Sequence, residues 1–350
     1  MLLLQLACAT LSDKDSSHNE YINPLDWDVY QVGPYRTGYI SVDEIYTDFA
    51  GEERTITVNI WYPTDDEDGD VGVYVGYLED ENVISNAKIS KAVHEDGYPL
   101  FIFSHGSFGY GGNSPFLMHH LTSHGFVVLA PDHKGNSVLD YGEDQVPMIK
   151  VWRAQDNQAS ISALEQMEWS DQVNTEKIIL SGHSFGSWDN WLLGGGTLDQ
   201  NAIDTFCTSE TEFSRPCTDA ERDAFEQNFT DERIQGIVPM AGAKYFEWFA
   251  EGGRSNLSIP VYQMSGTDDV DDPQRIFDEN ESTPFRWLEI QGGCHQAFAL
   301  GACPNISNED AFQITKVYNL AFAREVLFAD DSVTSILDGN DSPEFVKIYK

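Results

Sequence analysis

Two patterns of hydrophobic and polar positions divide the chain near residue 98. Before it, the segments GYISVDEIYT (38–47) and RTITVNIWYP (54–63) alternate apolar and polar residues and are rich in β-branched side chains. This alternation predicts an antiparallel pair of strands that opens a sheet. After it, the apolar runs become continuous, which is typical of strands covered on both faces.

The second part alternates these apolar runs with helical patterns. The predicted strands are PLFIFSHG, GFVVLAPDHKG, EKIILSGHSFG and the runs at 234–242, 259–266 and 285–293. The predicted helices are NSPFLMHHLTSHG, 149–169, one directly after residue 184, and 309–328. Strands that alternate with helices join through right-handed crossovers, so we expect an α/β fold with a mostly parallel sheet and helices on both faces. Ligands of such sheets bind at the carboxyl ends of the strands.

Two segments depart from this alternation. Residues 196–231 are rich in Asp, Glu, Thr and Asn and contain Cys207 and Cys217. Loops of that length seldom lack structure in a compact domain, so we expect an insertion over the site that a disulfide staples. Residues 9–35 are polar and predict a tether or edge segment in front of a single domain at 36–350.

Acidic residues dominate the charge of the chain. There are 58 Asp and Glu against 20 Lys and Arg, which gives a formal net charge of −38. The few cations are scattered, which excludes general nucleic-acid binding, since phosphate contacts need a basic surface. The same charge disfavours adhesion to anionic membranes. We interpret the acid excess as a solvated surface that repels itself unless salt screens it, and therefore predict a halophilic protein from a saline habitat.

The five cysteines fall into two close pairs and one remainder. Cys207 with Cys217, and Cys294 with Cys303, lack the CxxC spacing of zinc sites, and no set of Cys and His partners accompanies them. We therefore expect two local disulfides and an oxidising compartment. The alternative is four buried thiols in a cytosolic enzyme. The sequence predicts no metal and no cofactor.

The remaining cysteine, Cys8, follows an apolar run, Leu2 to Ala7, that is too short to span a bilayer. Leu6-Ala7-Cys8, followed by small and polar residues, resembles the end of a bacterial lipoprotein signal with Cys8 as the lipidated residue. This resemblance predicts a secreted or cell-surface lipoprotein of a bacterium, anchored to the membrane through Cys8. The alternative is a disordered N-terminus.

The candidate chemistry begins at Gly182-His183-Ser184-Phe185-Gly186, which matches G-x-S-x-G and directly follows the predicted strand KIILSG. Small flanking residues let a chain turn sharply from strand to helix and expose the serine hydroxyl. Ser184 is therefore the candidate nucleophile. The alternative is a glycine-rich packing turn with an incidental serine.

A serine nucleophile needs a base that a carboxylate holds in place, and in this arrangement the partners follow in the order Ser, Asp or Glu, His. His295 is the one histidine after Ser184, and it follows a predicted strand on a Gly-rich loop. Four aspartates compete for the acid within GTDDVDDP, after the strand IPVYQMSG. We choose Asp269, with Asp268 as the second choice.

Acyl transfer also needs backbone N–H donors aimed at the developing oxyanion. Phe185, directly after the nucleophile, supplies one donor. The loop after PLFIFSHG supplies the other, with Ser107 as the first choice and Phe108 as the second. We interpret His105 and His183, inside these motifs, as structural hydrogen-bonding residues rather than bases.

Three more histidines, His119, His120 and His124, fall on one predicted helix. Two of them have the i, i+4 spacing that metal sites use, but no third ligand follows. A solvated helix face is the favoured interpretation.

The motifs YPLFIFSHGSFGYGG, LTSHGFVVLAPDHKGNS and GHSFG together resemble the α/β-hydrolase branch that contains dienelactone hydrolase-like proteins and platelet-activating factor acetylhydrolases. The resemblance covers residues 95–300 and implies an α/β-hydrolase fold and a serine hydrolase that uses Ser184, Asp269 and His295. Dienelactone hydrolase itself uses cysteine, so Ser184 indicates an esterase. Animal acetylhydrolases take their acid after the preceding strand, which here has no carboxylate before Glu247.

These observations predict a carboxylic ester hydrolase of the carboxylesterase or lipase type, acting as a monomer on a small-molecule or polymeric ester. The alternatives are a polyester hydrolase of the cutinase type, a phospholipid acetylhydrolase, and a lipoprotein that binds without turnover. We expect Phe108, Tyr110, Trp188 and Phe298 to line the acyl pocket. The alternative for these four aromatic residues is ordinary core packing.

Overall fold

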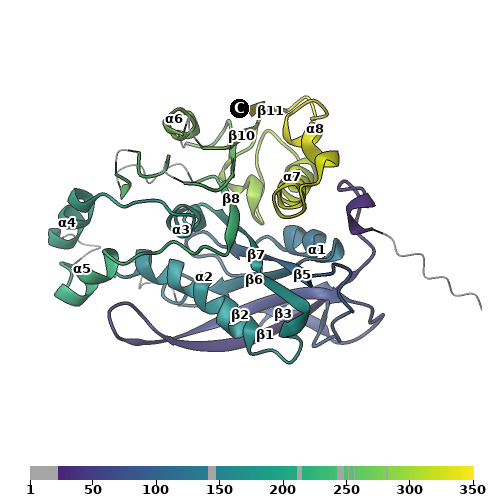
Figure 1. The fold of residues 1–350 in the computed structure, drawn as a ribbon, viewed down its shortest axis with the longest axis horizontal. Helices are drawn as coiled ribbons and strands as arrows, with labels where there is room; N and C mark the ends of the chain where they lie inside the picture. The colour runs from purple at the N-terminus through teal and green to yellow at the C-terminus, as the bar shows by residue number, and fades with distance from the viewer. Residues whose placement is uncertain are drawn as a thin grey trace, which may run out of the picture.

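The structure is a computed structural model that describes residues 23–140, 147–210, 215–242, 248–250, 252–255, 257–270, 272–280 and 283–350 (Figure 1). Cys8, the predicted lipidation residue, lies outside the described residues. Among the helices of the described ranges, none is both long and apolar enough to span a bilayer.

An 11-stranded sheet runs through the molecule in the order β11-β10-β9-β8-β7-β5-β6-β2-β1-β4-β3. The strands are β1 (Arg36–Thr47), β2 (Glu53–Thr64), β3 (Val71–Tyr74), β4 (Leu78–Ser85), β5 (Tyr98–Ser104), β6 (Val127–Asp132), β7 (Val173–His183), β8 (Ile234–Met240), β9 (Val261–Gly266), β10 (Phe285–Ile290) and β11 (Val346–Tyr349). The central strands, from β10 to β6 in this order, are parallel, and β2 and β11 flank them in antiparallel pairing. The predicted antiparallel pair is β1 with β2.

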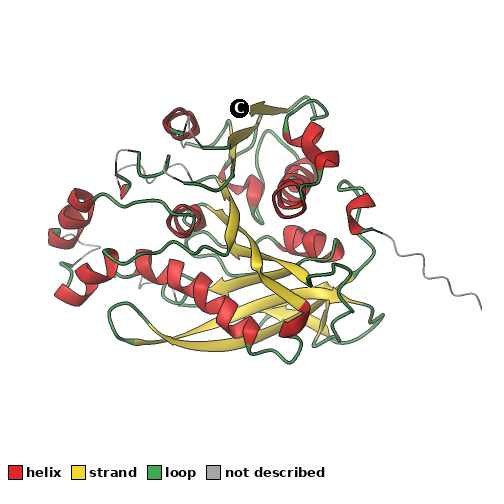
Figure 2. Ribbon diagram, in the orientation of Figure 1, coloured by secondary structure: helices red, strands yellow, loops and turns green. Residues whose placement is uncertain are grey.

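Helices cover both faces of this sheet (Figure 2). They are α1 (Pro115–Ser123), α2 (Ile149–Glu165), α3 (Gly186–Leu193), α4 (Gln200–Thr208), α5 (Asp219–Phe225), α6 (Pro273–Glu279), α7 (Asn308–Phe328) and α8 (Thr334–Leu337). One hydrophobic cluster joins the sheet to α2, α3 and α6, and a second joins its other face to α1, α7 and α8. The predicted fold class is confirmed.

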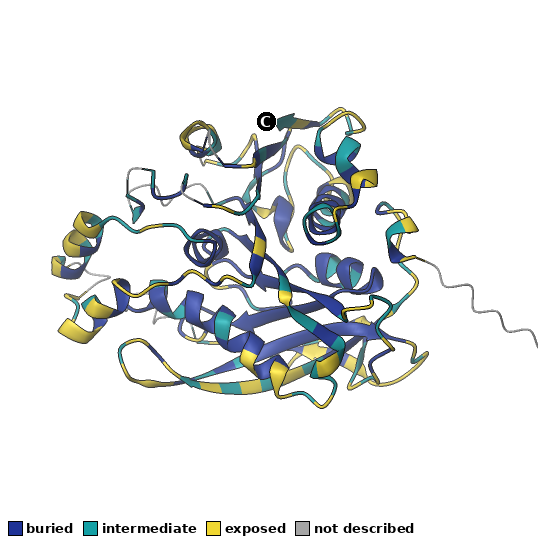
Figure 3. Cartoon of the chain, in the orientation of Figure 1, coloured by how far each residue is buried: buried dark blue, intermediate teal, exposed yellow. Residues whose placement is uncertain are grey.

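Burial follows the two sequence patterns. Every residue of β5 and β6 is buried, whereas β1 alternates buried or half-buried with exposed positions over most of its length (Figure 3). A strand between two helical layers has no solvent-facing side, so its run is apolar throughout. The sequence did not predict β11, which pairs with β10 at one edge of the sheet.

The segment at 196–231 contains α4 and α5, and a disulfide joins Cys207 to Cys217 as predicted. Its apolar residues pack onto the face that carries α2 and α3. The ring of Phe206 stacks edge-on against Trp248, and Lys150 Nζ lies over both rings and over Phe185. Lys150 therefore contacts both the insertion, at Phe206, and Phe185, the residue that follows the candidate nucleophile.

The described part of the predicted tether, residues 23–35, packs against α1 and α7. The carbonyl oxygen of Val29 lies 2.9 Å from His120 Nε2, and that of Gln31 lies 2.9 Å from His124 Nε2. Both histidines are buried, so the expected solvated helix face is wrong for this pair. Imidazole N–H groups satisfy carbonyls that the N-terminal segment would otherwise bury without partners.

Burial lowers the pKa of six histidines, because desolvation disfavours the imidazolium form. They are His94, His105, His120, His124, His133 and His183. Burial also raises the pKa of the Asp132 and Asp189 carboxyls to about 6.

These shifts predict a loss of stability on mild acidification. The ordinary pKa of histidine is 6.5, and below that pH the histidines of the unfolded chain bind protons while the buried imidazoles of the folded protein stay neutral. The free energy of unfolding therefore decreases as the pH is lowered. The raised pKa values of the Asp132 and Asp189 carboxyls increase the free energy of unfolding as the pH falls below about 6. These two groups oppose six histidines, so we expect the effect of the histidines to dominate. We expect urea unfolding to give a smaller free energy of unfolding at about pH 5 than at about pH 7.5.

A matched variant tests the cause of this pH dependence. His120→Gln keeps a side-chain N–H for the Val29 carbonyl and should make the free energy of unfolding less dependent on pH. Equal or greater stability of the unmodified protein at the lower pH would contradict the prediction.

Candidate functional site

The three residues of the predicted triad lie at the carboxyl ends of three parallel strands. Ser184 follows β7, Asp269 follows β9, and His295 follows β10. These strands belong to one parallel set, so their carboxyl ends share one edge of the sheet, where ligands of such folds bind. Residues 85 and 26 positions apart in the sequence thereby become neighbours.

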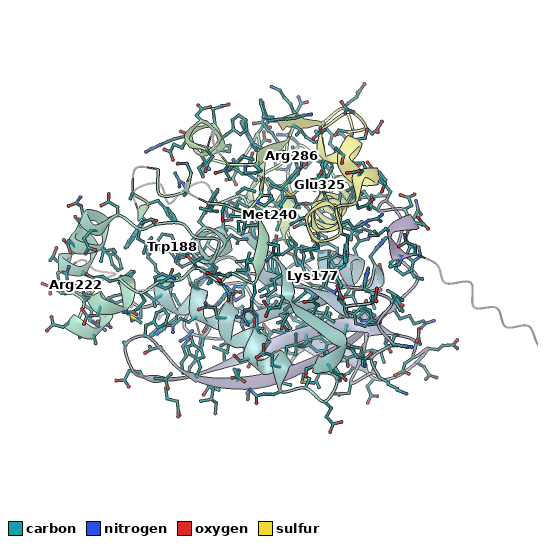
Figure 4. All side chains as sticks on the ribbon, in the orientation of Figure 1. Lys177, Trp188, Arg222, Met240, Arg286 and Glu325 are labelled. Carbon is teal, nitrogen blue, oxygen red and sulfur yellow. A yellow bond between two sulfur atoms is a disulfide. The ribbon has the colours of Figure 1, made fainter. Side chains whose placement is uncertain are left out.

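Ser184 sits in a sharp turn between β7 and α3. Its φ of 56° lies in the left-handed region, which is costly for a residue with a side chain and is found where surrounding contacts enforce it. Its backbone N–H donates to the carbonyl of Met240. Met240 is the last residue of β8 and is labelled in Figure 4. A Cβ on Gly186 would lie 2.0 Å from the carbonyl oxygen of Ser104, so the helix approaches β5 this closely only with glycine there.

A continuous chain of hydrogen bonds joins the three side chains. His295 Nε2 lies 2.8 Å from Ser184 Oγ, and His295 Nδ1 lies 2.8 Å from Asp269 Oδ2. The Asp269 side chain is only 3% exposed, whereas His295 is 29% exposed. A carboxylate can only accept, so Nδ1 carries the proton and Nε2 is left to accept from the serine hydroxyl.

Hydrogen bonds hold the loop after β9, which carries Asp269, against the loop after β10, which carries His295. The N–H of Asp268 donates to the carbonyl of Gly293, and that of Gly292 donates to Thr267 Oγ1. The predicted disulfide between Cys294 and Cys303 closes the loop beside His295. The Asp268 carboxylate accepts from Asn305 Nδ2 at 2.6 Å and is exposed, so the structure brings Asp269, and not Asp268, to the histidine.

His183 contacts the backbone of the candidate base, His295. Its Nε2 lies 2.7 Å from the carbonyl oxygen of His295, so it ties the base loop to the turn of Ser184. Burial lowers the pKa of His183 to about 4, which keeps the ring neutral. This contact agrees with a structural role. The sequence contained no signal for the partner, because the two residues are 112 positions apart.

The loop after β5 passes directly beside the nucleophile. A Cβ on Gly106 would lie 3.1 Å from Ser184 Cβ, so this backbone is in contact with the serine. The next residue, Ser107, is exposed. Phe108 was the second choice for the oxyanion donor, but its N–H donates to the carbonyl of Asn136 at 3.0 Å. Phe185 lies at the N-terminus of α3, where backbone N–H groups and the helix dipole favour negative charge.

The four aromatic residues predicted to line an acyl pocket separate into two kinds. Phe108 is 40% exposed on the loop beside Ser184, and Tyr110 lies 6.3 Å from Tyr74, centroid to centroid. Trp188 and Phe298 are fully buried, one in each hydrophobic cluster, so for them the core-packing alternative holds. The sequence alone does not distinguish these cases, because exposure depends on which helix face meets the sheet.

Within the described residues, no group of three or more His, Cys, Asp or Glu side chains is arranged to hold a metal ion. His119 is engaged with Asp80, at 2.8 Å between Nε2 and Oδ2.

Comparisons with known proteins agree with this architecture. Residues 71–146 match the family model described as platelet-activating factor acetylhydrolase, isoform II, a stretch that contains β5 and Ser107 but ends before Ser184. Among solved structures, a ferulic acid esterase from Streptomyces cinnamoneus is similar, with a TM-score of 0.62 and 18% identity over 90% of this chain and 97% of that chain. No curated protein matches the sequence. The chain therefore has the α/β-hydrolase fold, and the predicted resemblance to platelet-activating factor acetylhydrolases is confirmed over residues 71–146.

Proposed function

We propose that the protein hydrolyses carboxylic esters through an acyl-enzyme on Ser184. The observation that carries the proposal is the chain of hydrogen bonds from Asp269 through His295 to Ser184, at 2.8 Å for each link. The similarity to esterases supports ester hydrolysis as the reaction.

In this mechanism, Ser184 Oγ attacks the ester carbonyl carbon while His295 Nε2 takes the hydroxyl proton. Asp269 holds the ring in the required tautomer and stabilises the imidazolium that forms. The N–H groups of Ser107 and Phe185 donate to the oxyanion of the tetrahedral intermediate. His295 then gives its proton to the leaving alcohol, and water, activated by the same histidine, hydrolyses the acyl-enzyme.

The surface around the site favours uncharged, apolar esters. Large apolar side chains are exposed on the loops that carry or adjoin the site residues: Phe108, Val138, Leu139, Val270 and Leu300. These loops are joined to one another, since the N–H of Val138 donates to the carbonyl of Gly109 and that of Leu300 to the carbonyl of Asn113. An acidic protein also repels anionic substrates over the range of a Debye length.

A fluorophosphonate probe tests the proposal directly, because it phosphonylates only a serine that a neighbouring base activates. We expect one adduct, on Ser184, in the folded protein and none after unfolding. A panel of p-nitrophenyl esters from acetate to palmitate, with a polyester film, then defines the acyl group. Absence of the adduct in folded protein would overturn the proposal and favour a lipoprotein that binds without turnover.

A further inference from the structure

A buried arginine lies beneath the site. Arg153, on α2, has no exposed surface, although the chain contains only 20 Lys and Arg in all. Its Nη1 donates to Asn136 Oδ1 at 2.7 Å, and its Nη2 donates to Ser104 Oγ at 3.0 Å and to the carbonyl oxygen of His105. Its Nε lies 3.3 Å from Asp189 Oδ2.

These partners flank the first predicted oxyanion donor on both sides. The carbonyl of His105 belongs to the same peptide unit as the N–H of Gly106, directly before Ser107. On the other side, the carbonyl of Asn136 accepts the N–H of Phe108, whose φ of 62° is left-handed. A strained backbone of this kind persists only where several contacts determine it together. Arg153 contacts His105 within the strained loop and Asn136, the residue whose carbonyl accepts from Phe108.

Arg153 also contacts the second predicted donor. Its guanidinium carbon lies 4.7 Å from the centroid of the Phe185 ring. Asp189, its carboxylate neighbour, lies on α3, the helix that begins directly after Phe185. Ser104 Oγ donates to the same carboxylate at 2.5 Å, which joins the end of β5 to α3. One side chain therefore connects the loop of Ser107 to the helix of Phe185.

Stability alone does not explain this arrangement. Removing two charges from water costs several kcal/mol per ion, and replacing a buried ion pair by apolar side chains is often neutral or stabilising. A planar guanidinium, however, presents five N–H donors in a rigid fork, which suits it to fixing several acceptors at set angles. Fixed geometry matters most where donors must meet a charge that develops only in the transition state.

We propose that Arg153 is a positioning residue for the oxyanion hole, which fixes the backbone N–H groups of Ser107 and Phe185 relative to each other without touching the substrate. The inference rests on the proposed ester hydrolysis. It predicts that loss of the Arg153 side chain lowers kcat more than it changes KM, because the two N–H groups bind the transition state more strongly than the substrate.

The test compares Arg153→Lys and Arg153→Met with the unmodified protein on a short p-nitrophenyl ester. Lysine keeps the charge but not the fork, and methionine keeps much of the volume but no donor. We expect kcat to fall roughly 10- to 100-fold for lysine and further for methionine, with KM changed less than about threefold. The affinity for an alkyl boronic acid, which forms a tetrahedral adduct on the serine, should fall in parallel with kcat.

Arg324 provides the matched control. It is buried, bonds Asp330 through Nε at 2.7 Å and donates to the carbonyl oxygens of Trp27 and Leu25, so its contacts are of the same chemical types. Arg324→Lys should lower the unfolding midpoint as Arg153→Lys does, but leave kcat within about twofold. An equal loss of kcat in the two lysine variants, or a folded Arg153→Lys with unchanged kcat, would overturn the proposal.

Two further arms keep the test decisive. If the Arg153 variants do not fold, Asn136→Ala removes one acceptor while Arg153 stays beside Asp189, and kcat should fall about 3- to 10-fold at unchanged KM; unchanged kcat refutes the proposal. Fluorophosphonate labelling of the unmodified protein separates the two proposals. If the unmodified protein forms no adduct, the proposed function itself is refuted. If it forms the adduct but the Arg153 variants keep their kcat, only the proposed role of Arg153 is refuted.

Discussion

We expect Ser184→Ala to lower kcat for ester hydrolysis by about 10⁵-fold or more. In the proposed mechanism this hydroxyl attacks the ester and carries the acyl group. Alanine also keeps the left-handed backbone and the packing of the turn, so the variant should fold. The measurement is the initial rate on p-nitrophenyl butyrate, together with the loss of the fluorophosphonate adduct.

Ser307→Ala is the control for removal of a serine hydroxyl. Ser307 caps α7, where its Oγ accepts the N–H of Asp310 at 3.0 Å. This variant should lose about 1 kcal/mol of stability while its kcat stays unchanged. An active Ser184→Ala protein with a normal unfolding midpoint would show that the serine is incidental.

The second large effect concerns the acid. We expect Asp269→Asn to lower kcat by about 10⁴-fold near neutral pH, because an amide cannot hold His295 in the tautomer that accepts the serine proton. Asp268→Asn, one residue earlier, changes the same charge on an exposed side chain and should leave kcat within about threefold. The two rates, measured on the same ester, identify the acid, and a larger loss at Asp268 would refute our assignment.

The sequence predicted the central sheet well, because local features determine these strands. Continuous apolar runs placed β5 to β10, and the alternation of β1 and β2 indicated an antiparallel pair. The turn at Ser184 was recognisable because close contacts at Gly186 restrict the residue type. The short edge strands were harder to predict, since β11 is only four residues long and draws its stability from pairing with β10.

The aromatic residues and the histidines of α1 show the limits of local patterns. Trp188 and Phe298 were expected near substrate but are fully buried, and His120 and His124 were expected in solvent but hold the N-terminal segment. In each case the residue type suits either environment, so only the packing of distant segments determines which it occupies.

By itself, the sequence determined the alternation of strands and helices, the serine turn, the order of the candidate triad and the pairing of four cysteines, because each depends on periodicity, on a short motif or on proximity along the chain. The tertiary structure decided which of two adjacent aspartates meets the histidine. The N–H of Asp268 is bonded to Gly293 and that of Asp269 to Gly266, so the Asp268 side chain reaches Asn305 and that of Asp269 reaches His295. It also brought Arg153 together with residues of three other segments, at 104–105, 136 and 185–189, and no local pattern in the sequence records that these four segments meet.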